Sequence, residues 1–340
     1  MSDTFGELFV FEIANNHLGR VDHGLAIVEA MGAIARRHGI RAAVKFQYRD
    51  LDTFIHPDYR DRADVKHIRR FLDTRLSDAG FRTLVEAVRQ NDMRLVVTPF
   101  DEVSVRRCVE HGADVIKIAS CSADDWPLIE AVAATGTPVI ASTAGASIDD
   151  IDTLASYFNQ RKTEYALLHC VGLYPPRNED VHMGFLARLA HRYPGVSVGY
   201  SGHEAPDNLD VVIAAASRGA TILERHVGLP AEGAPLNAYS LNPEEVDRWV
   251  AAALRARVIN GADDSRQTSP EERDSLLSLK RGVFAARPIR KGSVISREDV
   301  FFAMPCSPGQ LTSGDFGRER ATHTATRDYA TRAPVSERAD

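Results

Sequence analysis

The stretch Leu95–Thr143, LVVTPFDEVSVRRCVEHGADVIKIASCSADDWPLIEAVAATGTPVIAST, decides the fold of this chain. Three short runs of apolar and β-branched residues alternate in it with two longer amphipathic segments. Runs of the first kind predict buried strands, and segments of the second kind predict helices. Strands that alternate with helices in this way form βαβ units with a parallel sheet. The predicted strands are Leu95–Phe100, Asp114–Ser120 and Pro138–Thr143, and the predicted helices are Val103–His111 and Pro127–Ala134.

The same alternation continues on both sides of this stretch and gives eight strand–helix units within residues 1–262. An α/β chain with this count and length predicts a (β/α)8 barrel, the TIM barrel, better than an open sheet, whose size is less constrained. The further strands are Leu8–Ala14, Ala42–Gln47, Tyr165–Cys170, Ser197–His203 and Ile222–Gly228, and the further helices are Gly24–His38, Phe81–Gln90, Ile148–Asn159, Phe185–Arg192, Leu209–Arg218 and Pro243–Val258.

One connection in the predicted barrel is unusually long. The segment Tyr48–Asp78, rich in charged and aromatic residues, separates the second strand from its helix. Loops longer than about 12–15 residues are usually functional or disordered. Because this one follows the C-terminal end of a strand, where barrel enzymes place their active sites, we interpret it as an active-site loop rather than a neutral insertion.

The barrel pattern stops after residue 262. Residues 263–281 begin with the polar, proline-containing run DDSRQTSPEERD and are predicted to be a linker. Residues 282–340 predict a small β-rich domain, in which Arg287–Asp299 is weakly echoed by Arg327–Asp340. A domain of this size is too small for a catalytic cavity of its own, so we expect it to cover another surface.

Composition narrows the class of protein. The chain has 340 residues, 44% of them hydrophobic, and a net charge of −6, which gives no reason to expect nucleic acid or an anionic membrane as a partner. No apolar run approaches the ~20 residues of a membrane span, and the start, MSDTFGELFV, lacks the regions of a signal peptide. The cysteines form no CxxC pair, so we expect a cytoplasmic protein. They are Cys108, Cys121, Cys170 and Cys306.

Polar residues gather at the ends of the predicted strands. In a closed barrel these ends face one shared cavity. A single strand lysine or histidine is more often a surface-reaching or hydrogen-bonded core residue. Eight polar strand ends are harder to explain by packing, because unpaired buried charge costs several kcal/mol. The strongest candidates are Lys45 and Lys117, from the second and fourth strands, and His203 and His226, from the neighbouring seventh and eighth strands.

Two combinations of these residues predict binding sites, one for an anion and one for a metal ion. Lys45 and Lys117, among hydroxyl groups, form an anion site for phosphate or carboxylate. His203 and His226, from neighbouring strands, can share one divalent metal ion and leave positions open for substrate and water. An anion site beside a metal suits a reaction between an anionic substrate and a carbonyl compound. The carboxylates that could complete the first or second shell are Glu12 and Glu224.

Nine motifs, in order along nearly the whole predicted barrel, resemble the sialic acid (N-acetylneuraminate) synthase family. This family condenses phosphoenolpyruvate with an N-acetylated hexosamine aldehyde. Residues 282–340 resemble its antifreeze-like (SAF) domain. The motifs are EIANNH (12–17), VKFQ (44–47), TPFD (98–101), KIAS (117–120), ST (142–143), LLHC (167–170), YP (174–175), GYSGH (199–203) and ERH (224–226).

The resemblance implies a role for each matching residue. His203 and His226 match manganese ligands, with Mg²⁺ or Co²⁺ as other candidate ions. The resemblance also implies a domain-swapped homodimer in which the small domain covers the partner's barrel. The implied catalytic residues are Glu12, Lys45, Lys117, His203 and His226. The implied phosphoenolpyruvate-binding residues are Lys45, Thr98, Lys117, Ser120, Ser142 and Ser201. The implied sugar-binding residues are Gln47, Tyr174 and Glu224.

Three positions depart from the family pattern, all on the sugar side. Gly172 stands where the family has an asparagine, Leu236 replaces an aspartate, and Met304 replaces an arginine of the small domain. Sites that pair polar substrate groups reject analogues lacking them, whereas apolar pockets discriminate weakly. We therefore expect N-acetylmannosamine to be a poor substrate, unless Arg177, Asn237 or the Tyr48–Asp78 segment supplies substitute contacts.

Two other functions are compatible with the residues. One is a Schiff-base pyruvate aldolase that uses Lys45 or Lys117 and needs no metal, against which the histidine pair argues. The other is a non-catalytic sugar-binding paralogue, suggested by the departures on the sugar side.

Overall fold

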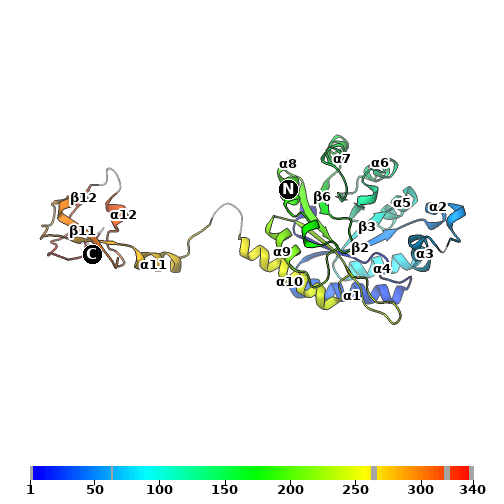
Figure 1. Ribbon diagram of the computed structural model, residues 1–340, viewed down its shortest axis with the longest axis horizontal. Coiled ribbons are helices and arrows are strands. Elements are labelled where there is room, and N and C mark those ends of the chain that lie inside the picture. Colours follow the sequence, from blue (N-terminus) through cyan, green and yellow to red (C-terminus); the bar gives the residue numbers. More distant parts are fainter. Residues whose placement is uncertain (1–2, 63, 262–265, 318–321, 337–340) are drawn as a thin grey trace. The chain divides into compact units, whose positions relative to one another are not determined.

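The computed structural model describes residues 3–62, 64–261, 266–317 and 322–336. The chain divides into two compact units, residues 1–261 and 262–340. Each unit is described by itself (Figure 1). No helix among the described residues is long and apolar enough to cross a membrane.

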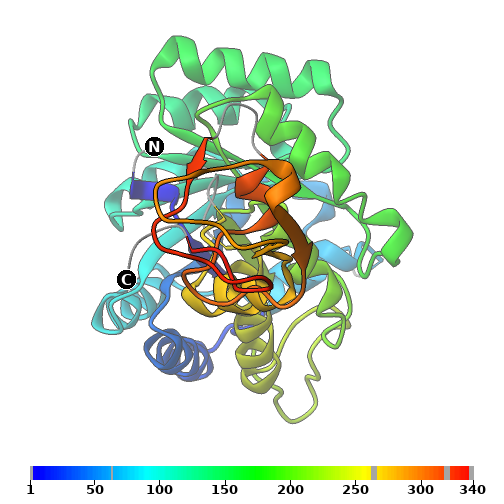
Figure 2. The same cartoon turned by 90° about the vertical axis from the view of Figure 1, so that its left-hand side faces the viewer.

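The first unit confirms the predicted (β/α)8 barrel. Eight parallel strands close on themselves in sequence order, from β1 to β8 and back to β1. Helices surround the strands (Figures 1 and 2). The strands are β1 Leu8–Glu12, β2 Arg41–Tyr48, β3 Arg94–Pro99, β4 Val115–Ile118, β5 Val139–Ser142, β6 Tyr165–Cys170, β7 Ser197–Gly202 and β8 Ile222–His226. The α-helices are α1 Val21–His38, α2 Leu51–Phe54, α3 Lys66–Asp73, α4 Asp78–Gln90, α5 Glu102–Glu110, α6 Trp126–Ala134, α7 Ile148–Arg161, α8 Gly184–Arg192, α9 Asp210–Ser217 and α10 Pro243–Asn260. Short 3-10 turns are η1 Asp3–Phe5, η2 Pro57–Tyr59, η3 Ser120–Ser122 and η4 Asn178–Asp180.

Two apolar layers hold the barrel together, because successive strand residues point to opposite faces. On β1, Phe9 and Phe11 belong to the large cluster between the strands and the helices. Leu8 and Val10 belong to a separate buried cluster inside the barrel. The next inward position on the same face is Glu12, so the apolar interior ends where the polar mouth begins.

Local capping fixes the start of some of the helices. Asn242 precedes α10 and forms a reciprocal capping box with Glu245, with Pro243 at the first helical position. Asp101 accepts the backbone N–H of Ser104 at the start of α5.

The long segment after β2 is not a bare loop. It contains α2, η2 and α3, and the helix that follows begins at Asp78, three residues before the predicted Phe81. Ser77 caps that helix by accepting the Gly80 N–H. The segment therefore presents ordered side chains near the end of β2.

The second unit is small and contains two antiparallel strand pairs, β9 with β11 and β10 with β12. The two echoed segments meet here, since Ile289 and Tyr329 exchange backbone hydrogen bonds of 2.9 and 2.8 Å. The last four residues of the second echo, 337–340, lie outside the described residues. The elements are α11 Pro270–Leu279, β9 Gly282–Ala285, β10 Val294–Ile295, η5 Arg297–Asp299, β11 Val300–Ala303, α12 Ser313–Phe316 and β12 His323–Thr324.

The described part of the predicted linker, 266–281, contains the helix α11, which was not predicted from the sequence. Ser269 accepts the N–H of Glu272 and Pro270 occupies the first helical position. Serine followed by proline is a helix-start signal in this context, and the polar composition hid it.

Candidate active site

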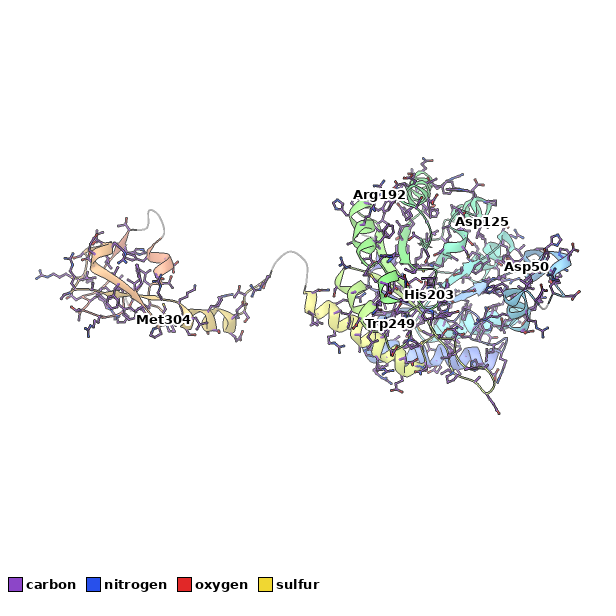
Figure 3. The ribbon with its side chains drawn as sticks, in the orientation of Figure 1. Asp50, Asp125, Arg192, His203, Trp249 and Met304 are labelled. Atoms are coloured by element: carbon purple, nitrogen blue, oxygen red, sulfur yellow. The ribbon has the colours of Figure 1, made fainter. Side chains whose placement is uncertain are left out.

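A cavity of about 560 Å³ opens at the C-terminal ends of the barrel strands. Every predicted site residue lines it, so the barrel brings together side chains from β1, β2, β3, β4, β5, β7 and β8 and from the loops that follow them. In Figure 3, His203 lies among the barrel strands. The lining residues predicted from the sequence are Glu12, Lys45, Gln47, Thr98, Lys117, Ser120, Ser142, Tyr174, Ser201, His203, Glu224 and His226.

Two buried lysines and two buried glutamates form the floor of this cavity. The Lys45 ammonium donates to Glu12 and to Glu224, with N–O distances of 2.7 Å each. The Lys117 ammonium donates to the Ser142 hydroxyl at 2.6 Å and lies 3.8 Å from Glu224. An ammonium has three N–H donors, so each lysine retains donor capacity for a ligand.

The charges on the floor are tuned by burial and by one another. Burial opposes the charge of Lys45, but Glu12 and Glu224 outweigh it and raise the pKa of this lysine above its ordinary value. Burial lowers the pKa of Lys117 to about 8, although Glu224 acts in the opposite direction. Burial would raise the pKa of Glu224, yet Lys117 and Lys45 hold it below its usual range. The site is therefore charged at neutral pH.

Some buried polar atoms on the floor have no hydrogen-bond partner among the described residues. The Thr98 hydroxyl and the Oε2 atom of Glu224 are buried, and within the described part of the chain neither has a hydrogen-bond partner. The Ser201 hydroxyl donates to the other oxygen of Glu224 at 2.7 Å. Buried polar groups are normally paired, so unpaired ones in a charged cavity indicate a place for a polar ligand.

His203 and His226 lie side by side above this floor, with ring centroids 5.3 Å apart. Burial, and then the neighbouring His226, lowers the pKa of His203 to about 3. Burial and Lys45 lower the pKa of His226 to about 3. Both imidazoles are therefore neutral at pH 7, which is the form that binds a metal.

The orientation of His203 also fits a metal ligand. Its Nδ1 atom lies 3.2 Å from the Val171 carbonyl oxygen, which can only accept a hydrogen bond. The proton must then be on Nδ1, and the lone pair is on Nε2. Among the described residues, no group of three or more His, Cys, Asp or Glu side chains is arranged to hold an ion. A metal here would need substrate or water to complete its coordination.

Several lining residues were not among the predicted site residues. Tyr239 packs against both histidines, with centroids 5.8 Å from His203 and 5.1 Å from His226. Arg49, Arg70 and Asn237 also line the cavity. Arg70 lies on α3 and Asn237 follows β8, where strand alternation does not apply, whereas Arg49 directly follows β2. The signal that pointed to the two arginines was the length of the segment carrying them.

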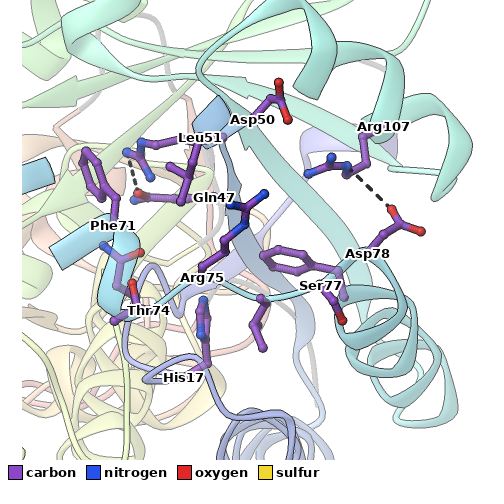
Figure 4. Close-up of a pocket in the computed structure, with 14 residues that line it drawn as sticks. His17, Gln47, Asp50, Leu51, Phe71, Thr74, Arg75, Ser77, Asp78 and Arg107 are labelled. Atoms are coloured by element: carbon purple, nitrogen blue, oxygen red, sulfur yellow. Dashed lines mark hydrogen bonds and ion pairs between the residues drawn. The ribbon is translucent and has the colours of Figure 1, made fainter. Parts of the chain in front are cut away.

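Two of the three positions that depart from the family pattern, Gly172 and Leu236, do not line this cavity. Gly172 is exposed, and Leu236 lines a neighbouring cavity of about 380 Å³. Met304 belongs to the second unit. His17 lines a different neighbouring cavity of about 240 Å³, together with Gln47 and Arg75 (Figure 4).

A buried ion pair joins the two chain segments that carry the histidines. Glu204 follows His203, and Arg225 precedes His226. The two side chains form an ion pair, and Arg225 also donates to the Glu204 carbonyl at 2.7 Å. The Tyr200 hydroxyl donates to Glu204 at 3.1 Å.

We expect Glu204→Gln to lower the free energy of unfolding by about 3–5 kcal/mol, because it leaves Arg225 buried without an opposite charge. Denaturant unfolding measures the change. The control is Asp152→Asn, which breaks an exposed pair with Arg192. A loss in the Glu204 variant no larger than in the control would contradict the prediction.

The fold and the cavity define the class of the protein. A (β/α)8 barrel with buried charged groups and neutral imidazoles at its C-terminal mouth is arranged as a barrel enzyme. Residues 33–265 match the NeuB family, and the chain belongs to that family. The resemblance to sialic acid synthases is thereby confirmed, and the chain is an enzyme of this class.

Known proteins support the same assignment. The chain is 30% identical to an uncharacterised protein of Methanocaldococcus jannaschii, over 85% of this chain and 82% of that protein. A solved structure from Chromobacterium violaceum, described provisionally as spore coat polysaccharide biosynthesis protein E, is 43% identical with a TM-score of 0.93 and covers 97% of this chain and 98% of its own. The N-acetylneuraminic acid synthetase of Leptospira borgpetersenii is 25% identical with a TM-score of 0.69, covering 79% of this chain and 89% of its own.

Proposed function

We propose that this enzyme condenses phosphoenolpyruvate with a sugar aldehyde and releases a 3-deoxy-2-keto sugar acid and phosphate. One observation carries the proposal: the same cavity contains two buried lysines on its floor and two neutral imidazoles above them. The lysines suit a small polyanion, and the imidazoles suit a divalent ion that acts on a carbonyl group.

Phosphoenolpyruvate binds on the floor in this proposal. Lys45 and Lys117 face its phosphate and carboxylate, and the unpaired Thr98 hydroxyl donates to one of them. Charge-assisted hydrogen bonds of this kind are stronger than neutral ones. The other hydroxyls assigned to this substrate are those of Ser120, Ser142 and Ser201.

The proposed metal ligands are His203 and His226, and the ion is Mn²⁺, with Mg²⁺ or Co²⁺ as other candidates. When bound, the ion supplies a Lewis acid for the aldehyde oxygen. The hydrogen bond to the Val171 carbonyl holds the His203 ring in the required tautomer.

The proposed bond changes balance as follows. C3 of phosphoenolpyruvate bonds to the aldehyde carbon as the C=O π bond opens, and the aldehyde oxygen takes up a proton and becomes a hydroxyl. A water oxygen bonds to C2. The C2–O bond to the phosphate then breaks, the phosphate leaves with the bridging oxygen and its electron pair, and the new C2 hydroxyl gives its proton to the phosphate as the ketone forms. Lys117 and Lys45 stabilise the departing anion. Glu12, beside Lys45, is placed to accept a proton from the water.

Three residues face the aldose in this proposal. Gln47 and Tyr174 line the same cavity, and the Tyr174 ring lies 4.3 Å from the His203 ring, centroid to centroid. Glu224 accepts from Lys45 and Ser201 through one oxygen, which leaves its second oxygen for a sugar hydroxyl.

We assign residues 282–340 to an antifreeze-like domain that covers the partner's barrel in a domain-swapped homodimer. The domain's core of nine buried residues, including Ile289 and Tyr329, is small. Domains this small gain stability from a partner surface. The cytoplasmic location expected from the cysteine pattern stays a prediction.

The dimer has its own test. We expect the full chain to be a dimer in light scattering, and its activity per mole to fall when dilution separates the protomers. A monomer that retains full activity would contradict this arrangement.

One observation favours a second candidate function. A lysine with a pKa of about 8, as for Lys117, is partly neutral near physiological pH and could form a Schiff base with pyruvate. Treatment with pyruvate and borohydride would add mass to Lys117 in an aldolase. The condensing enzyme that we propose gives no such adduct.

The proposed function is tested by phosphate release from phosphoenolpyruvate, Mn²⁺ and a panel of aldoses. We expect release that requires both the aldose and the ion. Absence of release with every aldose, with Mn²⁺ still bound, would instead favour the non-catalytic paralogue.

A further inference from the structure

The segment between β2 and α4 contains six arginines, which differ in whether they have a partner within the segment. Four of its six arginines are satisfied within the segment itself. Three form ion pairs with aspartates, and one donates to a backbone carbonyl. These contacts are Arg62 with Asp64, Arg69 with Asp73, Arg75 with Asp52, and Arg60 with the Asp52 carbonyl oxygen.

The other two, Arg49 and Arg70, line the active-site cavity. Across the described residues, neither forms an ion pair with a carboxylate. A guanidinium is always charged and has a rigid fork of donors that matches carboxylates and phosphates. The two arginines that face the cavity are therefore the two that lack an anion.

Arg49 is held in place but keeps free donors. Its guanidinium lies 3.6 Å from the Phe100 ring centroid and 4.1 Å from that of Phe71. One N–H group donates to the Gln47 amide oxygen at 3.0 Å, and the buried Nε atom has no partner among the described residues. Burial lowers the pKa of Arg49 only to about 10, so the group stays charged at neutral pH.

Arg70 reaches the same cavity from α3. Arg70, His203 and His226 line this one cavity. Arg70 also lines the neighbouring cavity of about 380 Å³, and Asn237 lines both cavities as well.

Arg49 lies away from Lys45 on the floor. Lys45, Gln47 and Arg49 are spaced two residues apart along the same face of β2 and its continuation. A strand advances about 3.3 Å per residue. Arg49 therefore stands farther toward the mouth than Lys45, beyond the place assigned to phosphoenolpyruvate.

We propose that Arg49 and Arg70 bind an anionic group, a phosphate or a carboxylate, on the aldose at the end away from its aldehyde carbon. This inference rests on the proposed condensation and adds the class of its second substrate. It also gives a positive reason for the expected poor use of N-acetylmannosamine, which is neutral. The two arginines, which line the cavity, then contribute to this discrimination.

A matched set of acceptors tests the proposal. The set comprises a neutral N-acetylhexosamine, its 6-phosphate, and the corresponding 6-carboxylate. We expect kcat/KM for at least one anionic member to exceed that of the neutral sugar by tenfold or more. Comparison of the 6-phosphate with the 6-carboxylate shows which of the two anionic groups the site prefers. A neutral sugar that equals or exceeds both anionic members would overturn the proposal.

Variants assign the effect to the two residues. Arg49→Gln and Arg70→Gln should each lower the ratio of kcat/KM for the preferred anionic aldose to kcat/KM for the neutral sugar at least tenfold, without raising the KM of phosphoenolpyruvate. Arg49→Lys should retain part of the preference. The matched control is Arg62→Gln, which removes an exposed arginine of the same segment outside the cavity.

Equal losses with all three acceptors, or a raised KM for phosphoenolpyruvate, would mean that the arginines serve the other substrate and would overturn the assignment. Calorimetric titration of the full-length protein with the sugar 6-phosphate and with the 6-carboxylate does not depend on turnover. If the unaltered enzyme binds the 6-phosphate or the 6-carboxylate and the Arg70→Gln variant does not, the anion subsite is supported even when no aldose is condensed. Failure of both to bind the unaltered enzyme contradicts it.

Discussion

Replacing His203 or His226 by alanine is expected to lower turnover by at least about 10²–10³-fold, the loss caused by removing one group that stabilises developing charge. The reason is their shared position: two neutral imidazoles with ring centroids 5.3 Å apart at the mouth of the barrel. Steady-state kinetics measure the loss, and calorimetry with Mn²⁺ alone should show weakened binding in both variants.

A matched control separates this effect from unfolding. His191→Ala replaces an exposed histidine on α8 and should leave both turnover and Mn²⁺ binding unchanged. The unfolding temperature of the two active-site variants should stay close to that of the control. Full activity after complete removal of divalent ions by a chelator would refute the role given to the pair.

Removing Lys117 is expected to give the second large effect. Lys117→Ala should lower kcat/KM for phosphoenolpyruvate at least tenfold, or about 1.4 kcal/mol of transition-state stabilisation. The ammonium donates to Ser142 and lies among the groups assigned to the phosphate. Lys45→Ala should act in the same direction and also leave Glu12 and Glu224 buried without their shared cation.

The pKa of Lys117 predicts the direction in which kcat/KM changes with pH. The protonated form of Lys117 holds the anion, and its pKa is about 8. The value of kcat/KM reports the free enzyme, so it should fall as pH rises through about 8. Lys117→Arg keeps its charge at higher pH, and any activity it retains should lose this falling limb. A limb that stays at the same pH in the arginine variant would assign the titration to another group.

The alternation of strand residues made much of the site predictable. Because side chains alternate across a strand, Lys45 and Gln47 had to share a face, as did Glu224 and His226. Barrel closure then brought these faces to one mouth, which the described cavity bears out.

Other parts of the site depend on contacts that no periodicity encodes. Tyr239 reaches the histidine pair from the segment after β8. Arg49 and Arg70 differ from neighbouring arginines such as Arg69 and Arg75 in forming no ion pair among the described residues. The helix Pro270–Leu279 was missed because its polar composition resembled a linker.

The most direct test of the central claim uses phosphoenolpyruvate labelled with ¹⁸O in the bridge between C2 and phosphorus, in unlabelled water with an accepted aldose. Condensation with C–O cleavage predicts that the released phosphate carries the label, as seen by mass spectrometry. Unlabelled phosphate would mean that the P–O bond breaks, and it would contradict the account.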